Sequence, residues 1–509
     1  MPAAGIASVI RKRASSAVPP GKVALIAGER RVTFGELDEA SDRIASGLKA
    51  RGFKRGERLA VLGDNTPDWL EVFFAAAKLG GVVVPISHLL KPPEILFQIE
   101  DSGATWAFVE AKLLADKFLP IRERAGTELF AINGSAPDVA PGLDELRATA
   151  QVTIIAADGP ALADLIVLQY TSGTTGSPKA AMHSHQALLT QALHQIVDSG
   201  LSEDDVYLVV PAFSWASGLH YMTLSSFYLG ATVALHPLGG FDPDQLCAAI
   251  ERHRVTRVVM VPTVLRRLVP SGAARRHDLS SLKTVLTGSE PVPVALLEEF
   301  AEQLPGVGIL QGYGMSEFPI SITMLKPEHA IAKVGSAGKA TIATELRVVD
   351  EAGADRPPGE EGEIVLHSPA TMSGYWQRPE ETAAALVDGW LHTGDLGYLD
   401  EDGFLYIVGR KKDMIISGGL NVYPAEIEKV VAAHPSVREC AVVGTADENF
   451  GEVGLAHVVA EEGAPLDLDQ LRAYAAEQLS TYKVPKHWVL REQPLPRNPA
   501  GKVQKHLLS

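Results

Sequence analysis

Residues 170–182 combine side chains that suit contact with phosphate groups. Between residues 171 and 179 lie five hydroxyl side chains, two glycines and a lysine. Glycine lets a backbone turn tightly and bring its N–H groups close to a ligand, while hydroxyls donate hydrogen bonds and lysine adds a positive charge. The pattern predicts a loop that wraps a polyphosphate. It is not a Walker A loop, because Gly-x4-Gly-Lys-Ser/Thr is absent; a flexible Ser/Thr/Gly linker is the simpler alternative.

Four later stretches also combine glycine with charged or aromatic side chains. Residues 311–317 read Gln-Gly-Tyr-Gly-Met-Ser-Glu, and residues 389–395 read Gly-Trp-Leu-His-Thr-Gly-Asp. Residues 409–413 read Gly-Arg-Lys-Lys-Asp, and residues 496–503 read Pro-Arg-Asn-Pro-Ala-Gly-Lys-Val. Taken singly, these stretches also fit an exposed turn, a solvated charge run and a surface lysine.

Together these stretches resemble the motifs of the adenylate-forming acyl-CoA synthetase family, which includes acyl- and aryl-CoA ligases, luciferases and peptide-synthetase adenylation domains. The motifs stand in the family's order, and the resemblance covers nearly the whole chain. It implies an ATP-dependent acid–thiol ligase that forms an acyl-adenylate and then transfers the acyl group to CoA, with ATP, Mg²⁺ and CoA bound. Because carboxylate and triphosphate are both anionic, such a site must neutralise charge and align the reacting groups.

The resemblance also implies residue roles. Lys502 is the adenylation lysine, Glu317 binds magnesium, and Lys179 acts in the phosphate loop. Lys412 is the hinge between domains, and Gly419 borders the pantetheine tunnel. Tyr313 lies beside adenine, Ser316 touches the α-phosphate, Asp395 accepts the ribose hydroxyls and Arg410 contacts the nucleotide. The other implied nucleotide-binding residues are Thr171, Ser172, Gly173, Thr174, Thr175, Gly288, Ser289, Glu290, Gly312 and Gly314.

The acid pocket is predicted around residues 211–218 and 318–320. The candidate lining is Phe213, Ser214, Trp215, Ser217, Phe318 and Ile320. No Arg or Lys stands in these segments, so we expect a neutral, mainly apolar acid that is larger than acetate. Ser214 stands where many family members have histidine, and the following glycine falls one residue late. This departure leaves open a ligase with weak adenylation that mainly forms thioesters, and Trp215 could instead pack in the core.

The predicted elements that would position these residues alternate between strands and helices, as in βαβ units. Residues 58–63 and 82–85 read as strands with a helix over 69–79 between them, and this alternation recurs at 107–109 and 255–261. The spacing of Thr33 and Glu36 predicts a capping box. Residues 335–402 read as β-rich, and the last hundred residues as a small α+β unit. We therefore expect an α/β fold with a large domain over 1–411 and a mobile domain over 412–509.

Composition narrows the remaining functions. The chain has 509 residues and a net charge of −16, which argues against a nucleic-acid-binding surface. Its two cysteines and the lack of a long apolar run predict a cytoplasmic protein without a membrane span. Transfer to a carrier protein's phosphopantetheine remains an alternative to CoA, although no carrier domain is fused. A catalytically silent binding protein is a second alternative, and the oligomeric state stays open between monomer and homodimer.

Overall fold

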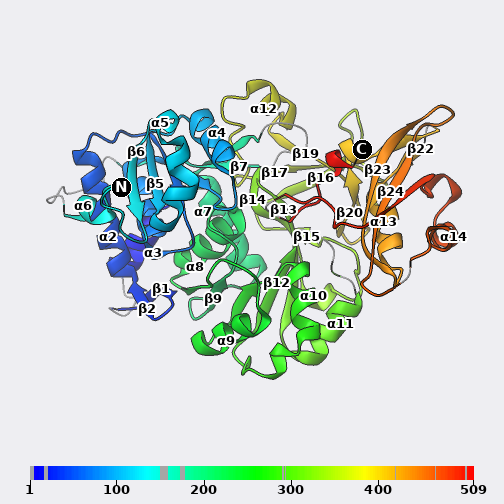
Figure 1. Cartoon of the computed structure of the whole chain (residues 1–509), viewed down its shortest axis with the longest axis horizontal. Coiled ribbons are helices and arrows are strands. Elements are labelled where there is room, and N and C mark those ends of the chain that lie inside the picture. Colours follow the sequence, from blue (N-terminus) through cyan, green and yellow to red (C-terminus); the bar gives the residue numbers. More distant parts are fainter. Residues whose placement is uncertain are drawn as a thin grey trace. The chain divides into compact units, whose positions relative to one another are not determined.

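The computed structural model describes residues 5–15, 21–148, 159–171, 178–288, 292, 294–418, 420–464, 466–498 and 501–508. The chain divides into two compact units (Figure 1). The first unit comprises Met1–Thr171, Lys179–Glu345 and His367–Ala384, and the second comprises Ser172–Pro178, Leu346–Leu366 and Ala385–Ser509. Within the described residues, no helix is both long and apolar enough to cross a membrane.

A six-stranded sheet in the first unit has the order β6-β5-β3-β4-β7-β8. Its strands are β3 (Arg58–Leu62), β4 (Val82–Ile86), β5 (Trp106–Glu110), β6 (Glu128–Ile132), β7 (Leu165–Tyr170) and β8 (Ala180–Ser184). All neighbours pair in parallel except β7 and β8. Helix α3 (Pro67–Leu79) connects β3 to β4, which confirms the predicted βαβ unit.

A nine-stranded sheet, also in the first unit, has the order β15-β14-β13-β12-β11-β9-β10-β1-β2. Its strands are β1 (Val23–Ala27), β2 (Arg30–Thr33), β9 (Val206–Val209), β10 (Thr232–Leu235), β11 (Arg257–Val259), β12 (Thr284–Gly288), β13 (Gly308–Met315), β14 (Phe318–Leu325) and β15 (Lys339–Ala340). The run from β1 to β13 across the centre is parallel. Consequently β9, β12 and β13 end at the same edge, where ligands of parallel sheets bind.

Helices cover these sheets. In the first unit they are α1 (Ser8–Ser15), α2 (Phe34–Ala50), α3, α4 (Pro92–Ser102), α5 (Arg122–Ala125), α6 (Leu143–Arg147), α7 (His185–Asp198), α8 (Ser225–Leu229), α9 (Pro243–His253), α10 (Pro262–Ser271) and α11 (Val294–Gln303). Helix α12 (Pro379–Ala385) follows at the end of this unit. Thr33 and Glu36 form the predicted capping box at the start of α2. A π-helix, η5 (Ser217–Leu224), precedes α8.

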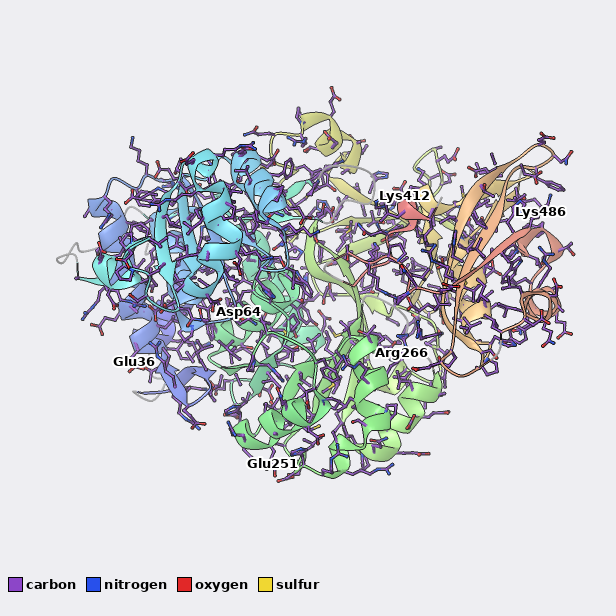
Figure 2. The ribbon with its side chains drawn as sticks, viewed as in Figure 1. Glu36, Asp64, Glu251, Arg266, Lys412 and Lys486 are labelled. Carbon is purple, nitrogen blue, oxygen red and sulfur yellow. The ribbon has the colours of Figure 1, made fainter. Side chains whose placement is uncertain are left out.

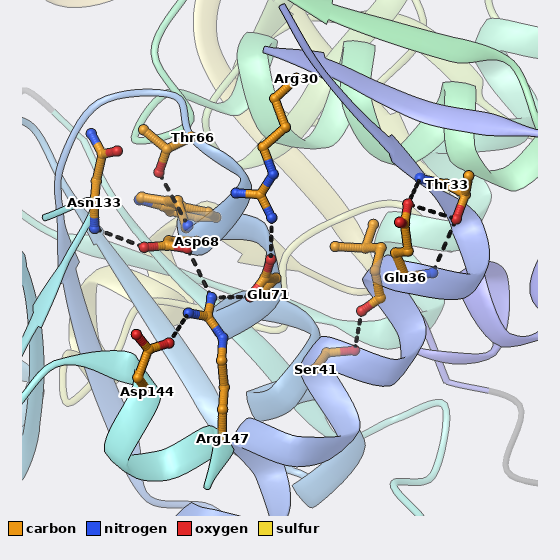
Figure 3. Close-up of polar contacts among 12 residues, drawn as sticks. Arg30, Thr33, Glu36, Ser41, Thr66, Asp68, Glu71, Asn133, Asp144 and Arg147 are labelled. Atoms are coloured by element: carbon orange, nitrogen blue, oxygen red, sulfur yellow. Dashed lines mark hydrogen bonds and ion pairs between the residues drawn. The ribbon is translucent and has the colours of Figure 1, made fainter.

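An ion-pair network ties α6 to α3 (Figure 3). The Arg147 guanidinium contacts Asp68 at 2.8 Å, Asp144 at 2.9 Å and the buried carboxylate of Glu71. Arg30 lies 3.8 Å from the same Glu71 carboxylate. Burial nevertheless raises the pKa of Glu71. A buried carboxylate needs such partners, because removing one leaves an uncompensated charge, so this network serves the packing of the N-terminal part.

The second unit contains two further sheets. The first has the order β16-β17-β19-β18, with β20 also paired to β19, and the other has the order β22-β21-β24-β23, with β25 paired to β24. Their strands are β16 (Glu345–Val349), β17 (Gly362–His367), β18 (Leu386–Val387), β19 (Trp390–Leu399), β20 (Leu405–Arg410), β21 (Ile415–Ser417), β22 (Leu420–Val422), β23 (Val437–Asp447), β24 (Gly451–Ala460) and β25 (His487–Arg491). Helices α13 (Pro424–Ala432) and α14 (Leu468–Gln478) pack against each other. The predicted domain boundary at residues 411 and 412 stays a prediction.

Candidate active site

The predicted phosphate loop is the connection of a β-hairpin. Strands β7 and β8 pair antiparallel up to Tyr170 and Ala180. The Thr171 N–H donates to the Lys179 carbonyl at 2.8 Å and closes the neck of the loop. The predicted residues between them lie outside the described residues: Ser172, Gly173, Thr174 and Thr175. The hairpin therefore fixes where the loop begins and ends.

The second motif is a hairpin turn at the edge of the nine-stranded sheet. Met315 pairs with Phe318, so Ser316 and Glu317 form the turn between β13 and β14. Gly312 lies opposite Gly288 on β12, and a Cβ added at Gly288 would lie 2.5 Å from the Gly312 carbonyl oxygen. Only glycine fits this approach. The structure thus brings two predicted glycines together with the glutamate turn; Tyr313 is partly exposed and Gly314 is exposed.

Tyr375, which sequence reasoning did not identify, joins these two motifs. Its hydroxyl donates to Glu317 Oε1 at 2.8 Å, and the Lys179 ammonium lies 5.4 Å from the centre of its ring. Tyr375 is held by an antiparallel bridge to Ala181 on β8. Burial, followed by the Glu317 carboxylate, raises the pKa of the Tyr375 phenol, so the phenol remains a hydrogen-bond donor. The contacts align a cation, a phenol and a carboxylate beside the phosphate-loop neck.

The Glu317 turn fits a magnesium ion that is also held by phosphate. Mg²⁺ keeps several waters and takes one or two carboxylates together with phosphate oxygens, rather than a cage made by protein alone. In the described part of the chain no group of three or more His, Cys, Asp or Glu residues could hold a metal. A carboxylate has two oxygens, so Glu317 can offer Oε2 to a cation while Oε1 accepts the Tyr375 bond.

The predicted acid-pocket residues divide into exposed and buried members. Trp215 and Ser217 are partly exposed, which places Trp215 outside the fully buried core. Phe213 is completely buried against Trp69, with ring centres 5.3 Å apart. Phe318 is also buried and stacks on His194 at 5.7 Å. The side chain of Ile320, together with Ser289 and Glu290, lies outside the described residues.

Asn65 fixes the backbone of the predicted pocket loop and was not found by sequence reasoning. Its amide nitrogen donates to the Pro211 carbonyl at 2.8 Å, and its amide oxygen accepts from the Phe213 N–H at 2.7 Å. The Gln169 amide donates to the Ser214 carbonyl at 2.9 Å. Asn65 lies in the connection after β3 and Gln169 lies on β7, so one connection and one strand of the six-stranded sheet hold this loop.

We expect Asn65→Ala to raise the KM for the acid by about tenfold. The variant leaves the buried Phe213 N–H without a partner, which costs about 1–3 kcal/mol, removes the bond to the partly buried Pro211 carbonyl, and loosens the loop at Phe213. The KM for ATP should stay within about two-fold, because both of these Asn65 amide bonds go to the acid-pocket loop. Steady-state kinetics with each substrate varied in turn checks this. Equal increases in both KM values would contradict a role limited to the acid.

In the second unit, Asp395 and Arg410 face each other across β19 and β20. Arg410 Nε lies 2.9 Å from Asp395 Oδ1, and the Asp395 side chain is only 6% exposed. The Asp395 N–H also donates to the Thr393 hydroxyl at 3.1 Å. A nearly buried carboxylate with a fixed backbone and one arginine partner can accept hydrogen bonds from a polar ligand in a defined direction.

Lys502 belongs to the same cluster of charges. The residue as a whole is exposed. Desolvation by the surrounding protein nevertheless lowers the pKa of Lys502, the positive charge of Arg410 lowers this pKa further, and the Asp395 carboxylate raises it. Lys412, labelled in Figure 2, lies in the 3₁₀ helix η8 (Lys411–Asp413) and interacts electrostatically with the same residues. Burial also lowers the pKa of Lys412. The structure thus brings together four predicted residues of this unit, while Gly419 lies outside the described residues.

Comparison with known proteins accounts for this arrangement. Residues 12–376 match the model of the AMP-binding enzyme family, and residues 426–502 match that of the AMP-binding enzyme C-terminal domain. The chain belongs to the AMP-binding enzyme family. It is 39% identical over 493 residues to feruloyl-CoA synthase of an Amycolatopsis species, covering 96% of this chain and 95% of that protein. It is 38% identical to the indoleacetate–CoA ligase of Aromatoleum aromaticum, covering 96% and 94%.

A solved CoA synthetase has the same fold. Bacillus subtilis o-succinylbenzoate CoA synthetase, in complex with ATP and a magnesium ion, matches with a TM-score of 0.87 and 33% identity, covering 98% of each chain. These comparisons confirm the predicted α/β fold class and the predicted enzyme class, an AMP-forming acid–thiol ligase. The solved synthetase binds ATP and magnesium, and the curated relatives form CoA thioesters, which confirms the predicted cofactors ATP, Mg²⁺ and CoA.

Proposed function

We propose that this chain activates a neutral aryl or alicyclic carboxylic acid as its acyl-adenylate and transfers the acyl group to CoA. Two relatives that match almost the full chain are named for aromatic acids, feruloyl and indoleacetate. The contact series that joins Lys179, Tyr375 and Glu317 carries the proposal, because it places a cation and a carboxylate beside the phosphate-loop neck. Charge neutralisation at this point is what joining two anions requires.

Each charged residue then has a distinct part. Lys179 would neutralise phosphate charge at the loop, and Glu317 would hold the magnesium ion, which screens the triphosphate. Asp395 would accept the ribose hydroxyls with Arg410 beside it. Lys502 would donate to the α-phosphate region while the acid attacks. Tyr313 and the paired Gly288 and Gly312 would form the adenine side of the site, and Ser316 would touch the α-phosphate.

The second half-reaction is proposed to use the second domain, residues 412–509, after rotation about Lys412. Lys502 is needed only while phosphate is attacked, so it can leave when the thiol arrives. Gly419 would then border the narrow pantetheine passage. The phosphopantetheine of a carrier protein presents the same thiol arm as CoA. A carrier protein is therefore the second candidate acceptor, because the sequence motifs are the same for both acceptors.

A panel of carboxylic acids with ATP and CoA tests the proposal. We expect pyrophosphate and AMP release that depends on a neutral aromatic or alicyclic acid, with acyl-CoA of the matching mass. Carboxylic acids that carry a second charge, such as malonate, should react more slowly. Pyrophosphate release without acyl-CoA, combined with loading of an added carrier protein, would favour the carrier alternative. Absence of pyrophosphate release with every acid would contradict the proposed function.

A further inference from the structure

Five buried polar side chains lie on the β7–β8 hairpin, on the loop and the π-helix η5 that contact it, and on helix α7, which packs on η5. They are Gln169, His183, Gln191, Ser214 and His220, which we call the polar cluster, and each is at most 4% exposed. His183 lies opposite Val167, and Gln169 is two residues further along β7, so both side chains leave the hairpin on the same side. The Ser214 carbonyl accepts from Gln169, and the His183 and His220 rings lie 5.7 Å apart.

The polar cluster contains many atoms without partners. Within the part of the chain that the structure describes, no hydrogen bond reaches Gln169 Oε1, His183 Nδ1, Ser214 Oγ, either amide atom of Gln191 or either ring nitrogen of His220. Buried polar side chains in folded proteins are almost always paired, and an unpaired one carries the full cost of its desolvation. A concentration of such atoms in one place indicates a site that something else completes.

The backbone at this place is also unusual. Residues Ser217–Leu224 form a π-helix, a rare conformation that occurs often at functional sites. Helix α7, which carries Gln191, packs directly on η5, which carries His220. The π-helix begins right after the loop that Asn65 holds, so His220 is placed by the same segment that forms the predicted acid pocket.

The cluster also borders the other predicted motif. His183 Nε2 lies 2.8 Å from the Ser316 carbonyl oxygen, directly beside Glu317. Burial lowers the pKa of His183 to about 4 and that of His220 well below its ordinary value, so both imidazoles are neutral. A neutral imidazole and an amide donate and accept hydrogen bonds, and they would not balance a second carboxylate.

We propose that the substrate acid carries, besides its reacting carboxylate, a neutral hydrogen-bonding substituent such as a hydroxyl, carbonyl or N–H group, which His220 and Gln191 bind. This inference rests on the proposed function and names the acid more closely: a mainly apolar body with one polar group. Trapped water is the competing occupant of the cluster, since buried waters also satisfy polar atoms.

Matched acids distinguish the two occupants. We compare cinnamic acids that carry a ring hydroxyl at the 2, 3 or 4 position with the acids that carry a ring methyl group at the same position. The two members of each pair differ little in size but differ in hydrogen bonding. With the native enzyme, ATP and CoA, we expect kcat/KM for the hydroxyl acid to exceed that for its methyl partner by about 10- to 100-fold for at least one position. Equal values, or a preference for the methyl acid at every position, would overturn the inference while leaving acid–CoA ligation intact.

Variants of His220 and Gln191 test whether these side chains bind the polar substituent of the acid. His220→Phe should reduce the hydroxyl-to-methyl ratio to about 3 or less, with the KM for ATP unchanged. Gln191→Met, of similar shape, serves as the second variant if His220→Phe does not fold, as judged by thermal melting. His185→Phe is the matched control, because that buried histidine accepts from the Ile6 N–H at 3.0 Å instead. An unchanged ratio in both cluster variants, or an equal loss in the control, would overturn the assignment.

Discussion

Lys502→Ala is expected to slow formation of the acyl-adenylate by about 10²–10³-fold, the usual effect of removing one electrostatic stabiliser. In the second unit Lys502 lies in the same electrostatic cluster as Arg410, Asp395 and Lys412. Its charge is needed while phosphate is attacked and not when the thiol attacks the acyl carbon. Thioester formation from a supplied acyl-adenylate should therefore stay near the native rate. Pyrophosphate release and acyl-CoA formation are followed separately, and an equal fall in both would contradict the assignment.

The lowered pKa of Lys502 adds a dependence on pH. Because the ammonium is the active form and its pKa is lowered, adenylation should decline as pH rises through this pKa, sooner than for a fully solvated lysine. Arginine keeps its charge throughout this range. Lys502→Arg should therefore retain partial activity with the alkaline decline removed. A decline unaltered in this variant would assign the titration to another group.

Lys412→Pro is expected to act on the other half-reaction. Proline fixes φ near −65°, so a hinge residue that must change its backbone angles would be restricted to one pose. Acyl-adenylate formation should persist, and transfer to CoA should fall by about 10²-fold, because a small error in placing the reactants has effects of that size. Single-turnover measurements with preformed acyl-adenylate check this.

Lys412→Ala is the matched control for the hinge. It removes the ammonium but leaves the backbone free, so transfer to CoA should continue near the native rate. An unchanged transfer rate in Lys412→Pro would exclude residue 412 as the hinge. A loss in both variants would instead assign the effect to the side chain, which interacts with Asp413, Arg410 and Asp395.

Local patterns predicted the elements that depend on local interactions. The capping box at Thr33 and Glu36, the βαβ unit over β3 and β4 and the buried strand β7 are all encoded within a few residues. The supporting contacts of the site are not. Asn65 and Phe213 are separated by 148 residues, and Tyr375 and Glu317 by 58. No spacing rule connects such pairs, because they meet only after the sheets have formed.

The predicted acid-pocket residues also show that local sequence does not determine which side chains are buried. An aromatic residue beside a motif predicts a ligand contact and a core contact equally well. Phe213 packs completely against Trp69, whereas Trp215, two residues later, keeps part of its surface exposed. The loop backbone at Phe213 is held by hydrogen bonds to the distant Asn65, and no pattern within residues 211–218 encodes these bonds.

The amide of Asn65 has a consequence for exchanging acid preferences between relatives. A graft of residues 211–218 from another enzyme would import the side chains but leave their backbone anchored to a residue about 150 positions earlier in the chain. If the donor enzyme has a different residue at position 65, the grafted loop would lack the hydrogen bonds that fix its backbone in the donor. Grafts that exchange residue 65 together with the loop should keep the donor's ratio of kcat/KM between different acids. Grafts of the loop alone should show similar kcat/KM values for those acids.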